Sequence, residues 1–134
     1  MPERDREENR LTETRPLVSI VDDDESVRES LPDLVRQLGF AALGFSSAAE
    51  FLASEFVAET RCLIADVAMP GMSGPDLQRE LVSRGQAIPT IFITAHANEA
   101  LRRRLIGEGA VDCLFKPFSD AALLDALNAA LREP

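Results

Sequence analysis

Two kinds of hydrophobic pattern alternate along the chain. Short runs that are apolar at almost every position predict strands buried on both faces, and longer segments with apolar residues every three or four positions predict amphipathic helices. The predicted strands cover residues 17–21, 40–45, 61–65, 89–94 and 111–115. The predicted helices follow them in turn, at residues 24–39, 47–56, 75–85, 98–109 and 119–131. The pattern therefore predicts five successive strand–helix units.

Capping residues and a proline refine these helices. Side chains that can accept the free N–H groups of a first helical turn stand at the predicted starts, at Asp24, Ser47, Asn98 and Ser119. Pro32 lies inside the first apolar stripe, which continues beyond it, so we expect a bend there rather than an end. The buried faces predicted for the second and third helices consist of Phe51, Leu52 and Phe56, and of Leu77, Leu81 and Val82.

The order of these elements restricts the architecture. Strands that are apolar on both faces and joined by helices indicate a parallel sheet with helices on both sides. Right-handed crossovers leave few arrangements. A closed eight-stranded barrel needs roughly 200 residues or more, which exceeds this chain of 134 residues. The predicted fold class is therefore α/β, with one doubly wound, five-stranded parallel sheet.

Composition and charge narrow the classes of function. The net charge is −9, and a surface of this sign repels nucleic acid backbones, so no direct binding of nucleic acid is expected. No apolar run approaches the roughly 18–20 residues of a membrane span, and the charged N-terminus lacks the core of a signal peptide. Residues 1–16 are charged without a hydrophobic period, which predicts a flexible extension. We expect a cytoplasmic protein without membrane contacts.

Cysteine and lysine usage adds two observations. Cys62 and Cys113 lie within apolar runs, and His96 is the only histidine, so the chain offers no clustered set of zinc ligands. Both cysteines are predicted to be buried free thiols. The chain has 13 arginines but a single lysine, Lys116, which makes Lys116 a candidate functional residue.

Polar side chains stand where four of the predicted strands end. They are Asp22 and Asp23, Asp66, Thr94 and Lys116. The carboxyl ends of parallel strands meet at one edge of a doubly wound sheet, where ligand sites form. Three carboxylates gathered there repel one another unless a cation lies among them. Oxygen ligands favour Mg²⁺ or Ca²⁺, and a partial carboxylate cage that leaves water positions favours Mg²⁺.

The same groups suit phosphoryl transfer to a carboxylate. Lys116 and a bound cation can neutralise phosphoryl oxygens, and the Thr94 hydroxyl can donate a hydrogen bond to one of them. Asp66 ends a strand and precedes a loop rich in Pro, Gly and Ser. Asp66 is therefore the predicted nucleophile, and it would form an acyl phosphate.

Several motifs in this order carry a family resemblance. They are Ile20-Val21-Asp22-Asp23-Asp24, Asp66 with Met69-Pro70-Gly71-Met72-Ser73-Gly74, Thr94-Ala95, and Gly109-Ala110-Val111-Asp112 leading to Lys116-Pro117-Phe118. With them, the chain resembles the receiver domain of bacterial two-component response regulators, in the FixJ-like and NtrC-like branches. The resemblance implies a receiver domain at residues 17–133. It also implies a flavodoxin-like (βα)5 fold with strand order 2-1-3-4-5, and signalling in a two-component or phosphorelay pathway.

The resemblance implies how the acidic residues act. Asp66 would accept a phosphoryl group from a histidine of a sensor histidine kinase or of a histidine phosphotransfer protein. Mg²⁺, or Mn²⁺ in its place, would be bound by Asp23, Asp66 and the backbone carbonyl of Ala68. Asp22 would take part in this metal site mostly through water.

The resemblance also implies a switch. Thr94, Ala95 and Lys116 would contact the phosphoryl group, and the peptide bond between Lys116 and Pro117 is expected to be cis. Phosphorylation would then reshape the face formed by the last two helices and the strand between them. That face would bind a downstream protein partner or a second copy of the chain.

The chain departs from the family pattern at one switch position. Three residues before the lysine, the family carries a Tyr or Phe that turns inward, whereas this chain has Cys113 and contains no Tyr or Trp. The aromatic part of the switch is therefore missing, and its output is expected to differ. The two positions that tune loss of phosphate hold Ala68, which leaves room for water, and His96, which either orders a water or faces solvent.

Other functions remain as alternatives. A degenerate receiver that binds partners without being phosphorylated is favoured by Cys113 and opposed by the intact acidic set. An aspartyl-phosphate phosphatase needs a second Asp shortly after its nucleophile, where this chain has Val67 and Ala68. A histidine kinase needs a Gly-rich nucleotide loop that the sequence lacks. We expect no enzyme activity beyond the chain's own phosphorylation and dephosphorylation. The sequence is compatible with a stand-alone receiver and with a domain excised from a longer regulator.

Overall fold

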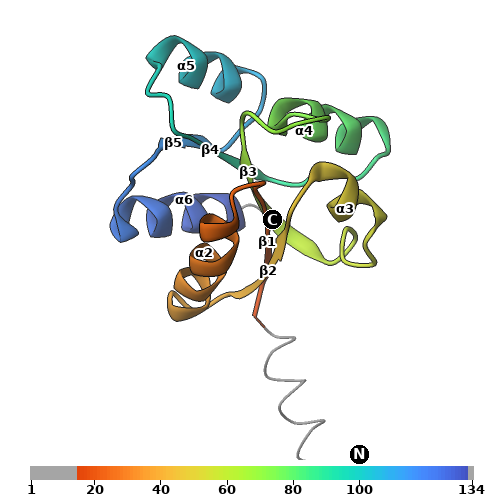
Figure 1. The fold of residues 1–134 in the computed structure, drawn as a ribbon, viewed down its shortest axis with the longest axis horizontal. Helices are drawn as coiled ribbons and strands as arrows, with labels where there is room; N and C mark the ends of the chain where they lie inside the picture. Colours follow the sequence, from red (N-terminus) through yellow and green to blue (C-terminus); the bar gives the residue numbers. More distant parts are fainter. Residues whose placement is uncertain (1–14, 133–134) are drawn as a thin grey trace, which may run out of the picture.

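The computed structural model describes residues 15–132 and confirms the doubly wound parallel sheet (Figure 1). Five parallel strands pair in the order β2-β1-β3-β4-β5, as predicted. The strands are β1 (Leu17–Val21), β2 (Ala41–Phe45), β3 (Thr60–Asp66), β4 (Thr90–Thr94) and β5 (Asp112–Phe115). The predictions for residues 1–14 and for residue 133 lie outside the described residues.

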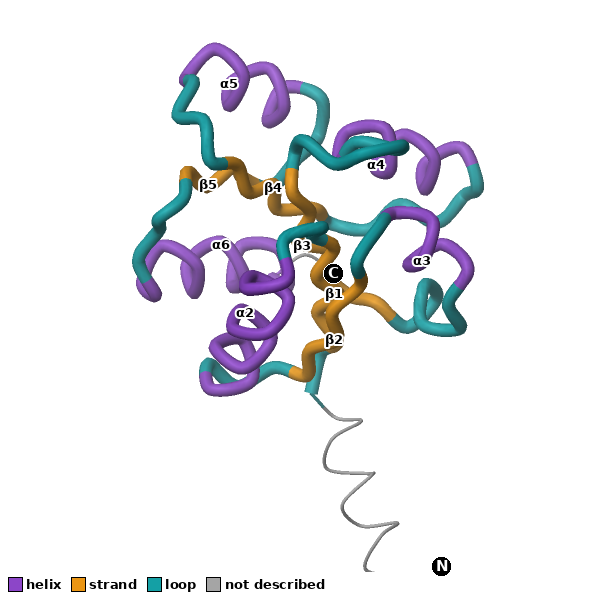
Figure 2. Tube along the Cα trace, in the orientation of Figure 1, coloured by secondary structure: helices purple, strands orange, loops and turns teal. Residues whose placement is uncertain are grey.

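Five helices of the described chain form the two outer layers. They are α2 (Glu25–Gln37), α3 (Ala48–Ala53), α4 (Gly74–Ser83), α5 (Glu99–Gly107) and α6 (Asp120–Arg132). Helices α2 and α6 cover one face of the sheet, and α3, α4 and α5 cover the other (Figure 2). Successive strand residues point to opposite faces, so Ile64 packs in the first core and Leu63 in the second. This arrangement explains why the central strands are apolar at every position.

The predicted helix caps are present. The side chains of Asp24, Ser47 and Asn98 accept hydrogen bonds from backbone N–H groups in the first turns of α2, α3 and α5. Ser119 accepts the N–H of Ala122 at the start of α6, at 3.0 Å. Pro32 lies within a continuous α2, which confirms that the helix does not end there.

Two predictions for the helix faces are wrong. Helix α3 ends at Ala53, so Phe56 lies beyond it and is only half-buried. The end follows from Ser54, which takes an extended conformation and donates both its N–H and its hydroxyl to the Phe51 carbonyl. Val82 is 60% exposed, because the buried stripe of α4 runs through Leu77 and Leu81, four residues apart.

The strand register brings the polar strand ends to one edge of the sheet. Val21 pairs with Ala65, so the next residue in each strand direction is an aspartate, Asp22 and Asp66. On the other side of β3, the last β4 residue, Thr94, follows the residue that pairs with Asp66. The fold therefore places the ends of β1, β3 and β4 next to one another.

Candidate functional site

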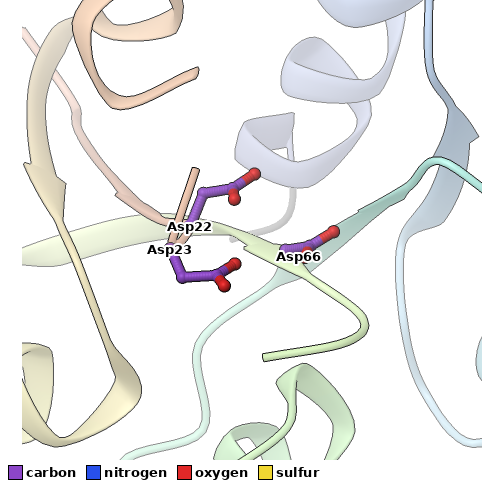
Figure 3. Close-up of side chains that lie close together, drawn as sticks. All are labelled: Asp22, Asp23 and Asp66. Atoms are coloured by element: carbon purple, nitrogen blue, oxygen red, sulfur yellow. The ribbon is translucent and has the colours of Figure 1, made fainter. Parts of the chain in front are cut away.

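Three aspartates form an acidic cluster at this edge (Figure 3). Asp22 and Asp23 directly follow β1, and Asp66 is the last residue of β3. One carboxylate oxygen from each residue lies within 4.8 Å of the others. Asp22 is buried, Asp66 is partly buried and Asp23 is exposed. The cluster is therefore open to solvent on the side of Asp23.

Lys116 connects two of these carboxylates. Its Nζ atom lies 3.0 Å from Asp22 Oδ2 and 3.6 Å from Asp66 Oδ1. Burial alone would lower the pKa of the Lys116 ammonium, but its hydrogen bond to Asp22 and the charges of Asp22 and Asp66 raise this pKa above its ordinary value. Lys116 is therefore a cation throughout the physiological pH range.

The backbone around Lys116 fixes its position after β5. The Lys116 N–H donates to the Thr94 carbonyl at 2.8 Å, which joins the ends of β4 and β5. The peptide bond between Lys116 and Pro117 is cis. Lys116, the only lysine of the chain, therefore lies at the same edge of the sheet as the three aspartates.

The pKa of the Asp66 carboxyl is raised above its ordinary value. Burial is the main cause of its raised pKa, and the negative charges of Asp22 and Asp23 raise it further. The charge of Lys116 acts in the opposite direction but does not cancel these effects. Three carboxylates with one ammonium leave net negative charge at the site, so a divalent cation would be attracted to it.

Thr94 lies at the end of β4 and is buried, with 3% of its surface exposed. Its hydroxyl oxygen accepts the backbone N–H of His96 at 3.1 Å. Ala95 and His96 are both exposed on the loop that leads to α5. The structure therefore brings Thr94 to the same edge as the aspartates, and His96 faces solvent there.

Ala68 and Cys113 lie in contrasting surroundings. Ala68 is exposed on the loop between β3 and α4, and within residues 15–132 no hydrogen bond engages its backbone carbonyl. Cys113 is 1% exposed and packs in the core between the sheet and α5. Burial, followed by the charge of Asp112, raises the pKa of the Cys113 thiol, so Cys113 is an apolar core residue in this structure.

The sequence analysis assigned no role at the site to two residues that lie close to it. The guanidinium of Arg28, on α2, donates to the backbone carbonyl of Asp22 at 3.1 Å. Gly74, the first residue of α4, is buried and lies so close to the Asp66 carbonyl that a Cβ atom would overlap it. A glycine directly after the helix-capping Ser73 was the available signal for Gly74, whereas no local pattern marks Arg28.

The family model for the response regulator receiver domain matches residues 18–128. The chain belongs to this family. Receiver domains interact with sensor kinases and downstream effectors in two-component signal transduction, and phosphorylation on an aspartate is generally implied for them. Within residues 15–132, every helix is too short or too polar to cross a bilayer.

Individual relatives agree with the receiver family. The chain is 46% identical over 117 residues to nodulation protein W of Bradyrhizobium diazoefficiens, covering 87% of this chain and 52% of that protein. It is 41% identical over 114 residues to the transcriptional regulatory protein FixJ of Azorhizobium caulinodans, covering 85% of this chain and 54% of that protein. The chain thus spans about half the length of these curated relatives.

A solved structure shows the same fold. The crystal structure of FixJ-N superimposes with a TM-score of 0.78 at 38% sequence identity, covering 89% of this chain and 95% of that chain. The similarity in both sequence and structure extends across the receiver as a whole.

Proposed function

We propose that this receiver accepts a phosphoryl group on Asp66 in a Mg²⁺-dependent reaction, with a phosphohistidine of a partner kinase or phosphotransfer protein as the donor. The observation that carries the proposal is the cluster of Asp22, Asp23 and Asp66 oxygens within 4.8 Å, with Lys116 contacting two of them. The Asp66 nucleophile, the acidic pocket and the Lys116 ammonium therefore lie together at one edge of the sheet.

The residues present fit a divalent cation. All three side chains offer oxygen, the donor that Mg²⁺ prefers, and Mn²⁺ accepts the same ligands. Asp23 and Asp66 would hold the ion with the Ala68 carbonyl, and Asp22 would act through water. When bound, the ion supplies positive charge to phosphoryl oxygens during transfer.

Asp66, Lys116 and Thr94 have different roles in the proposed phosphoryl transfer. A carboxylate oxygen of Asp66 attacks phosphorus, a P–O bond forms, and the P–N bond to the partner's imidazole breaks with its electron pair returning to nitrogen. Lys116 is held at the site by Asp22, from which it can pair with a phosphoryl oxygen. The Thr94 hydroxyl would donate a hydrogen bond to another phosphoryl oxygen. Each residue lies at the same sheet edge.

The signal leaves the site through the backbone that follows it. Thr94 precedes the loop to α5, and Lys116 precedes the loop to α6. Movement of Thr94 and Lys116 toward a phosphoryl group reshapes the face formed by α5, β5 and α6. This face would bind a downstream protein or a second copy of the chain.

The same proposal sets the cellular context. The domain works in the cytoplasm, where free thiols persist, in keeping with two buried free cysteines. Its catalytic role is confined to its own phosphorylation and dephosphorylation, because the site contains a nucleophile and charge-stabilising groups for one phosphoryl group.

Intact-mass measurement after incubation with acetyl phosphate tests the proposal. We expect the wild-type chain to gain the mass of one phosphoryl group only with Mg²⁺, and Asp66→Asn to gain none. Lys116→Arg keeps the charge but not the compact ammonium geometry, and it should lower the phosphorylated fraction. Uptake by Asp66→Asn equal to wild type would place the nucleophile elsewhere. Absence of uptake by the wild type, with acetyl phosphate and with a kinase, would favour a degenerate receiver.

A further inference from the structure

The two adjacent aspartates Asp22 and Asp23 are held in very different ways. Every polar group of Asp22 has a partner: its N–H donates to the Phe45 carbonyl, and its carboxylate accepts from the Asp24 N–H at 2.9 Å and from Lys116. Its backbone carbonyl accepts from Arg28. Asp23 is exposed, and within residues 15–132 no hydrogen bond or ion pair holds its carboxylate. The direction of the Asp23 side chain therefore depends on its backbone.

The Arg28 guanidinium donates a hydrogen bond to the peptide unit that joins the two aspartates. Because a peptide unit is planar, a hydrogen bond to the Asp22 carbonyl oxygen also fixes the Cα atom of Asp23. Arg28 is half-buried, and its Nη1 atom donates to this oxygen at 3.1 Å. It reaches the peptide from α2, six residues further along the chain, so the contact ties the turn after β1 to the helix that follows.

We propose that Arg28 is a positioning residue for divalent cation binding, because it holds the Asp22–Asp23 peptide so that the open Asp23 carboxylate faces Asp66. This inference rests on the proposed Mg²⁺-dependent function. Arg28 contacts neither the cation nor the phosphoryl group in this role. It acts on the site through the backbone of the only exposed member of the acidic cluster.

The sign of the effect separates positioning from simple electrostatics. Removing a positive charge beside a cation site strengthens cation binding by Coulomb's law. Loss of an outer contact that orients a metal ligand weakens binding, typically by 10–100-fold. We therefore expect Arg28→Met, which keeps the apolar stem and removes the donor, to weaken Mn²⁺ binding about tenfold, at the low end of that range.

Arg36 provides a matched control on the same helix. Its guanidinium also donates to a backbone carbonyl, that of Ala42 in β2, at 2.8 Å. Ala42 lies near the start of β2, at the opposite end of the sheet from the acidic cluster. Arg36→Met removes the same charge and the same kind of contact, and it should leave Mn²⁺ affinity within about twofold of wild type.

Mn²⁺ titration followed by electron paramagnetic resonance measures the free ion for the wild type, Arg28→Met, Arg28→Lys and Arg36→Met. Arg28→Lys keeps the positive charge and serves as a second variant if Arg28→Met does not fold. The Mn²⁺ affinity of Arg28→Lys should lie between those of the wild type and Arg28→Met. Phosphorylation by acetyl phosphate at saturating Mg²⁺ should recover to near the wild-type rate in both Arg28 variants, because weaker binding is overcome by concentration.

The outcomes distinguish this inference from the proposed function. Unchanged or tighter Mn²⁺ binding in both Arg28 variants overturns the positioning role alone. Wild-type Mn²⁺ affinity with slow phosphorylation at saturating Mg²⁺ also overturns it, because Arg28 would then act on the phosphoryl group directly. If the wild-type chain binds no Mn²⁺, the cation-dependent function fails, and the role of Arg28 fails with it.

Discussion

Replacing Gly74 by alanine tests how closely α4 must approach the proposed phosphorylation site. The added Cβ atom would overlap the backbone carbonyl oxygen of Asp66 and lie 3.0 and 3.1 Å from two ring carbons of Phe92. Phe92 is fully buried and cannot turn away, and the carbonyl belongs to the end of β3. The helix start must therefore shift, together with the hydrogen bond from the Gly74 N–H to the Val67 carbonyl.

The cost of this shift can be bounded. Overpacking a well-packed site typically costs about 1–3 kcal/mol, and alanine regains less than about 1 kcal/mol from its higher helix propensity. We expect Gly74→Ala to lower the free energy of unfolding by about 1–2 kcal/mol. Gly107→Ala is the control: Gly107 ends α5 with nothing within 4 Å of an added Cβ, so this variant should be equally or slightly more stable than wild type.

Urea unfolding followed by far-ultraviolet circular dichroism measures both variants, since the chain has no Trp or Tyr for fluorescence. Gly74→Ala should also take up phosphate more slowly under conditions where it is fully folded, because Asp66 is displaced. A Gly74→Ala chain as stable as Gly107→Ala would show that the close approach of α4 to β3 does not constrain the site.

Two further predictions concern charge and burial. In the absence of divalent cations, Asp66→Asn should be more stable than the wild type, because burial and the charges of Asp22 and Asp23 raise the pKa of Asp66 in the folded chain. The loss of folding stability caused by ionised Asp66 in the wild type is absent below the ordinary carboxyl pKa of 3.8, and it is complete above the raised pKa of the folded chain. The urea midpoints of the wild type and Asp66→Asn should therefore diverge between these two pKa values. They should converge when Mg²⁺ is added. Equal midpoints at neutral pH in EDTA would contradict this. Separately, burial raises the pKa of Cys62 to about 12, and Cys113 is also buried, so both thiols should resist iodoacetamide until the chain unfolds. Rapid labelling of native Cys113, detected by peptide mass, would show that α5 opens readily.

The sequence predicted the sheet because the signals for it are local. Apolar runs and capping side chains act on their own segment, and strands followed by helices leave little choice of topology. The polar strand ends were found for the same reason, since the carboxyl ends of parallel strands must meet. The strand order itself was predicted from the family resemblance. The pairing of β1 with both β2 and β3 confirms this part of the order.

Features that depend on contacts between distant segments were not predictable. Val82 is as apolar as Leu81, but only the geometry of α4 on the sheet decides which of them is buried. Arg102 stands in a run of three arginines, a pattern that predicts a solvated helix face. Its guanidinium instead pairs with Asp112 of β5 at 3.1 Å, whereas Arg103 and Arg104 are exposed. Neither the burial nor the pairing is encoded in the neighbouring residues.

The three consecutive aspartates after β1 show the same principle within the site. Identical in the sequence, they differ in the structure because the strand ends and the helix begins within three residues. Asp22 still follows the strand and is buried against Lys116. Asp24 directly precedes α2 and caps it by accepting the Ser26 N–H. Asp23 lies between the two, bound by neither element, and is left to face Asp66 and solvent. The freedom of Asp23 is therefore a product of its neighbours' contacts, which is why its orientation should respond to Arg28, whose guanidinium contacts the Asp22 carbonyl from α2.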